Sequence, residues 1–248
     1  MLEELVQKLE QRKNEGLFRH RLTRQSPQTP HVKIATQLNL SFASNYYLGL
    51  ANHPEVAAAL CRGTLQYGVG SGASHLISGH SAVHHELENL LARFVELPSA
   101  LLFSTGYMAN IAVVTTLVGN HDAVFADKLN HASLNDAALL SKAKLIRYPH
   151  LDLDSLERAL ARTNVPNKLV LTDAVFSMDG DVAPIKELLT LCQKYGAWLL
   201  IDDAHGFGVL GFAGKGILHR SLEQIDLNSP HLIYMATLGK AVGVFGAF

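Results

Sequence analysis

The second half of the chain alternates between short apolar runs and longer stretches in which apolar residues recur every three or four positions. A short apolar run flanked by turn residues predicts a buried strand, and the longer period predicts a helix packed on one face. The runs that we predict as strands are ALLFS (100–104), AVFAD (123–127), KLIRY (144–148), KLVLTD (168–173), AWLLIDD (197–203) and HLIYMAT (231–237). The stretches that we predict as helices are GYMANIAVVTTLVG (106–119), NDAALLSKA (135–143), LDSLERALART (153–163) and IKELLTLCQKYG (185–196). This alternation predicts an α/β fold, with a mostly parallel sheet sandwiched by helices.

The beginning of the chain has a different pattern. Residues 2–25 are rich in both charge signs and place three leucines on one face, which predicts a helix. Two prolines end this helix, and residues 37–50 are strand-like up to a turn. We therefore expect residues 1–44 to form an N-terminal helix and strand segment, and residues 45–248 to form a large domain.

Two further helices flank a stretch of glycine and small polar residues. One begins at Pro54, a residue suited to the first helical position, and ends near Tyr67. The other is predicted over residues 82–97. The stretch between them, 68–81, is too long for a simple turn, so we expect it to wrap around a ligand or a neighbouring subunit.

Composition places the chain among ordinary globular proteins, with 48% hydrophobic residues, 17% charged residues and a formal net charge of −1. This charge balance gives no electrostatic reason to expect nucleic acid or an anionic membrane as the main partner. Cys61 and Cys192 lie in apolar helical patterns and are predicted to be buried free thiols of a reducing compartment. No apolar signal segment opens the chain and no apolar run is long enough to span a bilayer, so we expect a cytoplasmic enzyme.

Polar side chains follow most of the predicted strands. In open parallel sheets, ligands bind beyond the carboxyl ends of the strands, so these side chains are candidates for a site. Gly106 begins a helix directly after the first predicted strand, where free backbone amides can bind a phosphate, and Tyr107 lies beside it. The other candidates are His131, Ser177, Asp202, Asp203, His205, Thr237 and Lys240.

Lys240 lies among glycine and apolar residues in the stretch MATLGKAVGVFGAF (235–248). A lysine is costly to bury because its charged form loses hydration, so its pKa falls in a dry site. Such a lysine either lies on the surface of a loop or reacts, and the candidates around it favour reaction. The candidates include a phosphate-binding helix N-terminus, hydroxyls, a carboxylate, imidazoles and a buried amine. This set suits pyridoxal 5'-phosphate (PLP), which forms a Schiff base with a lysine and pairs its ring nitrogen with a carboxylate.

Seven motifs in this sequence resemble those of the α-oxoamine synthases, a family of fold-type I PLP-dependent transferases. The motifs are SFASNYYLGLANHPEV (41–56), GSGASHLISGHSAVHHELE (70–88), FSTGYMAN (103–110), DKLNHASL (127–134), VFSMDGDVAP (175–184), IDDAHGFGVLG (201–211) and TLGKAVGVFGA (237–247). They occur in the family's order from about residue 40 to the last residue. The resemblance implies an aspartate aminotransferase-like large domain with PLP as its cofactor.

The resemblance also implies a role for each candidate residue. Lys240 would form the Schiff base, and Asp202 would face the pyridine nitrogen. His205 would bind the hydroxyl side of the ring, and His131 would stack on the ring face and contact the substrate. The remaining cofactor-binding residues would be Gly106, Tyr107, Ser177 and Thr237.

Members of this family join an amino acid to an acyl thioester with loss of carbon dioxide. The wording of residues 70–88 is typical of the member that uses L-alanine and a pimeloyl thioester, carried on coenzyme A or on acyl carrier protein. The alternatives are the member that joins glycine to acetyl-coenzyme A, and a non-catalytic protein that keeps the fold. Arg19 resembles the arginine that meets the acyl substrate, although Arg21 is close enough to take this role instead. The resemblance also implies a homodimer, with the stretch 68–81 crossing the interface.

Two features depart from the family pattern. Tyr46 replaces the usual acid of the family motif SNDYLGL, which removes a charge near the expected entrance of the site. Family members also continue well beyond the position of residue 248, into a C-terminal small domain. We therefore expect this chain to be an incomplete large domain without that small domain, with impaired dimerisation and exposed apolar surface.

Other types of site fit the sequence less well. His80, His84 and Glu88 have the helical spacing of a metal set, but His80 precedes the predicted helix and the segment belongs to a motif without metal, so we expect none. The glycines of 68–72 lack both the preceding strand of a dinucleotide site and the lysine of a P-loop. Ser177 lacks the flanking glycines of a hydrolase nucleophile.

Overall fold

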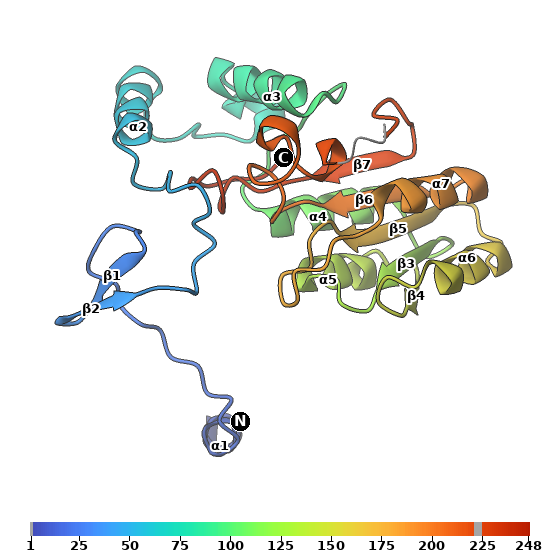
Figure 1. The fold of residues 1–248 in the computed structure, drawn as a ribbon, viewed down its shortest axis with the longest axis horizontal. Helices are drawn as coiled ribbons and strands as arrows, with labels where there is room; N and C mark the ends of the chain where they lie inside the picture. Colours follow the sequence, from blue (N-terminus) through green and yellow to red (C-terminus); the bar gives the residue numbers. More distant parts are fainter. Residues whose placement is uncertain (1, 221–224) are drawn as a thin grey trace. The chain divides into compact units, whose positions relative to one another are not determined.

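The computed structural model describes residues 2–220 and 225–248, and its backbone contacts divide the chain into two compact units. The first unit is Met1–Ser44 and the second is Asn45–Phe248. The second unit holds the sheet and most of the helices (Figure 1).

The first unit begins with a helix that is shorter than the sequence pattern predicts. Helix α1 covers Leu2–Asn14, not residues 2–25. Gly16 adopts a left-handed backbone conformation with φ of 69°, which glycine reaches without steric cost. The Gly16 amide then donates to the carbonyl of Lys13 and the Leu17 amide to that of Arg12, the pair of bonds that closes a Schellman motif. The helix ends there because these bonds satisfy its last carbonyl groups.

A β-hairpin completes the first unit. Strands β1 (His31–Ile34) and β2 (Gln37–Leu40) pair antiparallel, with Val32 opposite Asn39. The sequence pattern predicts strand character only for the second of them. The two-residue turn contains Ala35 with a positive φ of 51°, and it lacks the glycine or asparagine that normally identifies such a turn in a sequence.

The second unit opens with two helices on either side of the glycine-containing stretch. Helix α2 covers Pro54–Tyr67, and the side chain of its N-cap, His53, accepts a hydrogen bond from the Glu55 amide. Helix α3 covers Ala82–Val95. Between them lies one π-helical turn, η1 (His75–Gly79). Cys61 on α2 is exposed, so the expectation that both cysteines are buried is wrong for this one; Cys192 is buried.

Five parallel strands form the sheet, in the order β4-β3-β5-β6-β7. The strands are β3 (Ala123–Asp127), β4 (Lys144–Tyr148), β5 (Lys168–Asp173), β6 (Trp198–Asp202) and β7 (Leu232–Met235). The helices around them are α4 (Gly106–Leu117), α5 (Ala132–Leu140), α6 (Leu153–Arg162) and α7 (Ile185–Tyr195). Two 3-10 turns, η2 (Phe212–Gly214) and η3 (Ile217–His219), follow β6.

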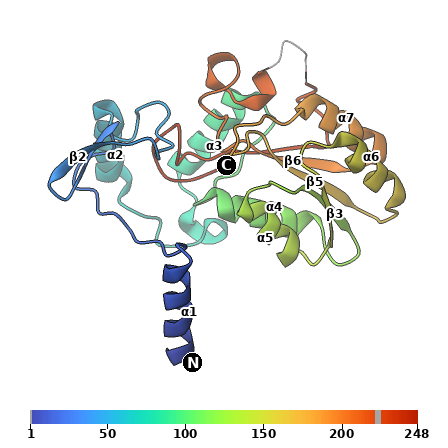
Figure 2. The same ribbon diagram turned by 60° about the horizontal axis from the view of Figure 1, so that its bottom comes forward.

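Alternate residues of each strand belong to two separate apolar cores, because side chains of a strand alternate between its two faces. On one face, Phe125 and Val170 pack in the cluster that includes residues of α6 and α7. On the other, Val124 and Leu171 pack in the cluster that includes residues of α4 and α5. Figure 2 shows these helix pairs on opposite sides of the sheet. The predicted α/β fold with a parallel sheet between helices is therefore confirmed.

One predicted strand is absent from the described part of the chain. In the run 100–104, Phe103 makes a single antiparallel bridge to Ala247, with two hydrogen bonds of 2.8 Å, and the flanking residues do not extend it. One bridge does not make a ladder, so the prediction of a strand over these residues is wrong. Within the described residues, no helix has both the length and the apolar character needed to cross a membrane.

The order of the strands determines where a ligand can bind. From β3 the chain crosses to β4 on one side and then returns past β3 to β5 on the other. The helices that leave β3 and β5 therefore lie on opposite faces, and the carboxyl ends of these strands face a crevice that neither helix fills. Polar residues at these strand ends are thereby directed toward a common space.

Candidate active site

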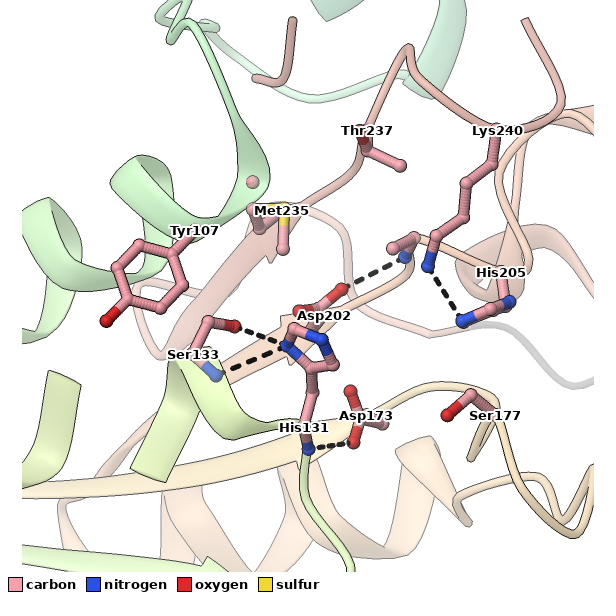
Figure 3. A pocket seen from close by; sticks show the side chains of 12 residues that line it. Tyr107, His131, Ser133, Asp173, Ser177, Asp202, His205, Met235, Thr237 and Lys240 are labelled. Carbon is pink, nitrogen blue, oxygen red and sulfur yellow. Dashed lines mark hydrogen bonds between the residues drawn. The ribbon is translucent and has the colours of Figure 1, made fainter. Parts of the chain in front are cut away.

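A pocket of about 170 Å³ lies at the carboxyl ends of the central strands. Eight of the residues that the sequence analysis selected line it together, although they come from five separate segments of the chain (Figure 3). They are Gly106, Tyr107, His131, Ser177, Asp202, His205, Thr237 and Lys240. The other lining residues are Ser133, Asp173, Ala204 and Met235.

The amine of Lys240 points into this pocket and contacts His205. The lysine Nζ atom lies 2.7 Å from Nε2 of the imidazole (Figure 3). Burial lowers the pKa of Lys240, against the opposing influence of the Asp202 and Asp173 carboxylates. Burial and the nearby Lys240 charge together lower the pKa of His205 to about 4. Both shifts favour neutral side chains, and a neutral amine is the nucleophilic form of lysine.

Tyr47 holds the other side of the His205 ring. Its hydroxyl oxygen lies 2.7 Å from Nδ1 of His205 and 3.2 Å from Oδ1 of Asn45. The asparagine oxygen can only accept, so it receives the single hydroxyl proton of Tyr47, and the tyrosine oxygen accepts from Nδ1. A neutral imidazole protonated on Nδ1 presents Nε2 as an acceptor, which then receives an N–H of Lys240. The chain of bonds therefore has one direction, from the lysine through the imidazole to Asn45.

Asp202, the last residue of β6, is the most deeply placed acid of the pocket. Its Oδ2 atom accepts a 2.8 Å hydrogen bond from the side-chain nitrogen of Asn110, and its Oδ1 atom accepts from the Ala204 amide at 3.1 Å. Burial raises the pKa of Asp202, while these two hydrogen bonds and the charge of Lys240 oppose the increase. A buried carboxylate of this kind is stabilised by a cation held close to it.

His131 follows β3 and caps the N-terminus of helix α5. Its Nδ1 atom accepts a 3.2 Å hydrogen bond from the Ser133 amide and lies 2.7 Å from the Ser133 hydroxyl. Because Nδ1 accepts, the proton of the neutral ring is on Nε2, which is left as a donor. The His131 backbone amide donates to Oδ2 of Asp173 at 2.6 Å, which fixes the position of the ring relative to strand β5.

Asp173 was not among the candidates that the sequence analysis selected. It is the last residue of β5, it is buried, and it lines the pocket. Burial, and then the charge of Asp202, raise its pKa to about 7. The rule that selected the other strand ends applies to Asp173 as well, so the signal was present in the run KLVLTD.

Two further residues of the site, Asn110 and Tyr47, carried no signal in the sequence. Asn110 donates to Asp202 and also to the Ser133 hydroxyl, at 2.9 Å, so it connects the acid with the residue that contacts His131. It lies one turn into helix α4, where nothing in the sequence identifies a buried polar side chain with a partner 92 positions away. Tyr47 pairs with a residue 158 positions away, and no pattern of spacing indicates such a pair.

The N-terminus of helix α4 forms one wall of the pocket. Thr105 caps this helix by accepting a hydrogen bond from the Met108 amide. The first two helical residues, Gly106 and Tyr107, line the pocket, and backbone amides at this position favour anions. The Tyr107 hydroxyl donates to Asp136 at 3.0 Å, which orients the ring beside the cavity.

Asp203 follows Asp202 directly but belongs to a different environment. Its Oδ2 atom accepts from the Ile217 amide at 2.7 Å and from the Tyr234 hydroxyl at 2.8 Å. Burial raises the pKa of Asp203 to about 7. Successive residues of an extended segment face opposite ways, so this acid supports the turn after β6 and does not line the pocket.

The remaining residues singled out by the sequence lie elsewhere. Arg19 and Arg21 are exposed residues of the first unit, and their contact with an acyl substrate stays a prediction. Tyr46, which replaces the family's acid, uses its hydroxyl within its own turn, where it bonds to the carbonyl of Gly49 at 2.5 Å and to the Asn52 side chain. It therefore shapes the segment that carries Tyr47.

Comparisons with known proteins give consistent results. The family model described as aminotransferase class I and II matches residues 37–248. Two curated proteins, the 8-amino-7-oxononanoate synthases of Nitrosomonas europaea and Nitrosospira multiformis, are 64% and 63% identical to this chain. The alignments cover 100% and 99% of the chain, but only 64% and 61% of these relatives. The chain therefore spans less than two thirds of their length.

Solved structures of the same fold are also similar. A serine palmitoyltransferase from S. paucimobilis, with a bound PLP-myriocin aldimine, superposes with a TM-score of 0.88 and 29% identity, over 98% of this chain and 63% of that one. The 8-amino-7-oxononanoate synthase of Francisella tularensis superposes with a TM-score of 0.70 and 34% identity, over 83% of this chain and 56% of that one. The predicted fold and the resemblance found in the sequence motifs are confirmed.

Proposed function

Because the chain belongs to the aminotransferase class I and II family, we propose that its pocket binds PLP and that the complete protein condenses L-alanine with a pimeloyl thioester. The products would be 8-amino-7-oxononanoate, carbon dioxide and the free thiol of coenzyme A or acyl carrier protein. This reaction is a step of biotin biosynthesis. The names of the relatives at 64% and 63% identity support this choice of substrates.

The observation that carries the proposal is that one pocket holds both a half-buried lysine, Lys240, and a buried carboxylate, Asp202. Asp202 has no ion-pair partner among the residues that the structure describes, and burial raises its pKa, so a cation in the pocket would stabilise it. The protonated ring nitrogen of PLP is such a cation, and the phosphate of PLP suits the amides of Gly106 and Tyr107. Ser177 and Thr237 add hydroxyl groups to the same pocket. The residues present therefore fit this cofactor.

PLP supplies an aldehyde that captures amines and a ring that withdraws electrons from the substrate's α-carbon. Asp202 would keep the ring nitrogen protonated, which an acid with a buried and hydrogen-bonded carboxylate can do. Lys240 would bond to the cofactor and, as a neutral amine, accept the proton from the α-carbon of alanine. His205 accepts a hydrogen bond from Lys240 and would orient the amine for both roles.

His131 would act on the acyl substrate. Its Nε2–H is a donor, because Nδ1 is occupied as an acceptor of the Ser133 amide. A neutral imidazole donor placed at the thioester carbonyl would stabilise the negative charge that develops on the oxygen when carbon attacks. The hydrogen bond from the His131 amide to Asp173 keeps this donor in a constant position.

The test combines cofactor binding with turnover. We expect borohydride to trap PLP covalently on Lys240 in this chain, and the Lys240→Ala variant to give no covalent adduct. The full-length protein should release thiol fastest with L-alanine and a pimeloyl thioester, compared with glycine or serine and with acetyl- or succinyl-coenzyme A. Faster release with glycine and acetyl-coenzyme A would assign the protein to that alternative reaction. Bound PLP without thiol release for any pair would favour a non-catalytic protein.

We also propose that the protein pairs with a second copy through the stretch 68–81. Four apolar side chains on and beside this stretch are almost fully exposed, which costs free energy in water. They are Leu65 (89%), Val69 (95%), Leu76 (96%) and Ile77 (82%). We expect the Leu76→Ser/Ile77→Ser double variant of the full-length protein to be monomeric in light scattering. A dimer of unchanged stability in this variant would exclude the stretch from the interface.

A further inference from the structure

Four histidines and a glutamate cluster where the π-helical turn η1 meets the start of helix α3, away from the pocket described above. We propose that three of them, His80, His85 and Glu88, form a binding site for a divalent transition-metal ion such as zinc. The ligand atoms of these three side chains all lie within 4.8 Å of one another. No other group of three or more such side chains converges in this way within residues 2–220 and 225–248.

The distance between two of these ligand atoms is close to that of a metal site. Nε2 of His80 lies 3.9 Å from Oε2 of Glu88. A tetrahedral zinc ion with bonds of about 2.1 Å holds its ligand atoms roughly 3.4 Å apart. Small rotations of two partly exposed side chains close this difference, because their side chains are 35% and 15% exposed. Two imidazoles and one carboxylate are also a donor set that zinc accepts, with water completing the four positions.

The carboxylate of Glu88 is already oriented for this role. Its Oε1 atom accepts a 3.0 Å hydrogen bond from the Leu102 amide, which leaves Oε2 directed toward His80. Metal-binding carboxylates are typically held by such an outer hydrogen bond, which reduces the ordering that binding requires. The bond to Leu102 also stabilises this partly buried acid, which makes no ion pair with a lysine or arginine among the residues that the structure describes.

His75 provides the corresponding support for His80. The two Nδ1 atoms lie 3.2 Å apart, so one of them donates and the other accepts. If Nε2 of His80 binds the ion, Nδ1 of this neutral ring carries the proton and donates it to His75. This outer partner fixes both the tautomer and the plane of the ring that binds the metal.

His84 is excluded from the set by a different contact. Its Nδ1 atom accepts a 3.2 Å hydrogen bond from the Ser81 amide and lies 2.8 Å from the Ser81 hydroxyl, so it forms the capping box of helix α3. The spacing of His80, His84 and Glu88 in the sequence therefore indicates the wrong trio. The structure replaces His84 by its neighbour, His85, whose ring lies 5.8 Å from that of His80.

A metal at this position would connect the turn to the helix. His80 directly follows η1, whereas His85 and Glu88 belong to α3. One ion bound to all three side chains would therefore connect the turn to the helix. An ion that binds only the folded arrangement stabilises it. Zinc is therefore expected to order the stretch 68–81 without any contact to the pocket.

The proposal is tested by titrating zinc chloride into the purified protein with isothermal calorimetry. The Cys61→Ser background removes the exposed thiol, so that a cysteine ligand does not contribute to the binding that is measured. We expect one zinc ion per chain and at least tenfold weaker binding in His80→Gln, His85→Gln and Glu88→Gln. Glutamine at position 88 retains an oxygen for the Leu102 amide, so its effect on folding is small.

The matched control is His84→Gln. Glutamine serves the same position of a capping box, so this variant keeps the helix cap and should bind zinc within threefold of the parent protein. His85→Cys retains a ligand and should bind zinc at least as tightly as the parent. Unfolding midpoints in the presence of EDTA verify that each variant is folded. Unchanged binding in His85→Gln and Glu88→Gln, or an equal loss in His84→Gln, would overturn the proposal.

Discussion

The side-chain nitrogen of Asn110 lies 2.8 Å from the Oδ2 atom of Asp202, and both groups are buried. The same nitrogen lies 2.9 Å from the hydroxyl of Ser133, which in turn contacts His131. One amide group therefore links the acid at the base of the pocket to the imidazole at its side. Neither Asp202 nor His131 has its position set by its own segment alone.

Replacement of Asn110 by alanine should disturb both sides of the pocket. Loss of a hydrogen bond to a buried carboxylate is expected to lower the free energy of unfolding by about 1.5–3 kcal/mol. It should also weaken the binding of PLP, because burial already raises the pKa of Asp202 and the amide opposes that increase. Urea unfolding and a PLP titration measure the two effects. Asn167→Ala, which removes a 3.0 Å side-chain hydrogen bond to Asp122 and does not line the pocket, should change stability alone.

The Asp202→Asn variant should fold but lose most of its ability to activate alanine. A neutral amide does not hold a ring nitrogen in its protonated form, so removal of the α-proton is expected to slow by at least a hundredfold. Exchange of the alanine α-proton for deuterium, followed by NMR, reports this step directly. Equal exchange rates in the variant and the parent protein would remove Asp202 from its proposed role.

Tyr47→Phe tests the bonds that orient His205. Without the hydroxyl, Nδ1 of His205 loses its 2.7 Å partner and the ring loses the constraint that aims Nε2 at Lys240. A hydrogen bond of about 1–1.5 kcal/mol corresponds to roughly a tenfold change in rate, so kcat for thiol release in the full-length protein should fall by that factor. The KM for alanine should stay nearly constant. Tyr46→Phe is the adjacent control, and an equal fall in its kcat would point to the turn and not to His205.

Stability should depend on pH through Asp203. Its folded pKa of about 7 lies above its usual value of 3.8, so the folded state holds a proton that the unfolded chain releases. The stability that this group contributes is therefore complete below pH 4 and declines as the pH rises toward 7, by about 1.4 kcal/mol per pH unit. Asp173 acts in the same direction, and His205, with its folded pKa lowered to about 4, acts in the opposite direction between pH 6.5 and 4.

The Asp203→Asn variant lacks this titrating group, so we expect its unfolding free energy to depend less on pH than that of the parent protein. The difference in unfolding free energy between the parent and the variant should change by about 1.4 kcal/mol for each pH unit between pH 4 and 7, measured by urea unfolding at several pH values. The exposed Met178→Ala variant changes no titratable group, serves as the control and should give a constant difference. A constant difference for Asp203→Asn as well would mean that this acid is ionised throughout the range.

Alanine substitutions at Gly79 and at Gly63 should change the stability of the protein in opposite directions. A Cβ atom at Gly79 would lie 2.1 Å from the carbonyl oxygen of Ala73, so Gly79→Ala forces the turn η1 to move and should destabilise the protein by several kcal/mol. A Cβ atom at Gly63, within helix α2, meets nothing within 4 Å. Gly63→Ala should therefore stabilise the protein by about 0.4–1 kcal/mol, because alanine loses less conformational entropy in a helix. Thermal unfolding of both variants checks the signs.

The sequence by itself determined the elements whose pattern is local. Strands β3 and β5 are buried along nearly their whole length, and in the sequence they are continuous apolar runs. Helix α2 begins at Pro54 as predicted, because a proline without an amide proton suits that position. The strand ends also identified Asp202 and Lys240 as residues of a common site, since the carboxyl ends of parallel strands meet at one edge of a sheet.

Only the tertiary structure decided which side chains touch. Asn110 reaches Asp202 across 92 positions because α4 packs against the sheet, and Tyr47 reaches His205 across 158 because the segment before α2 lies beside the turn that follows β6. Likewise, the sequence places His84 at helical spacing with His80 and Glu88, and from the sequence we expected no metal there; in the structure His84 caps α3, whereas the ligand atoms of His80, His85 and Glu88 lie within 4.8 Å of one another. Periodicity in the sequence indicates which face of an element is apolar. A hydrogen bond between two elements, however, requires their atoms to be placed to within a few tenths of an ångström. That placement is set by the packing of the whole unit.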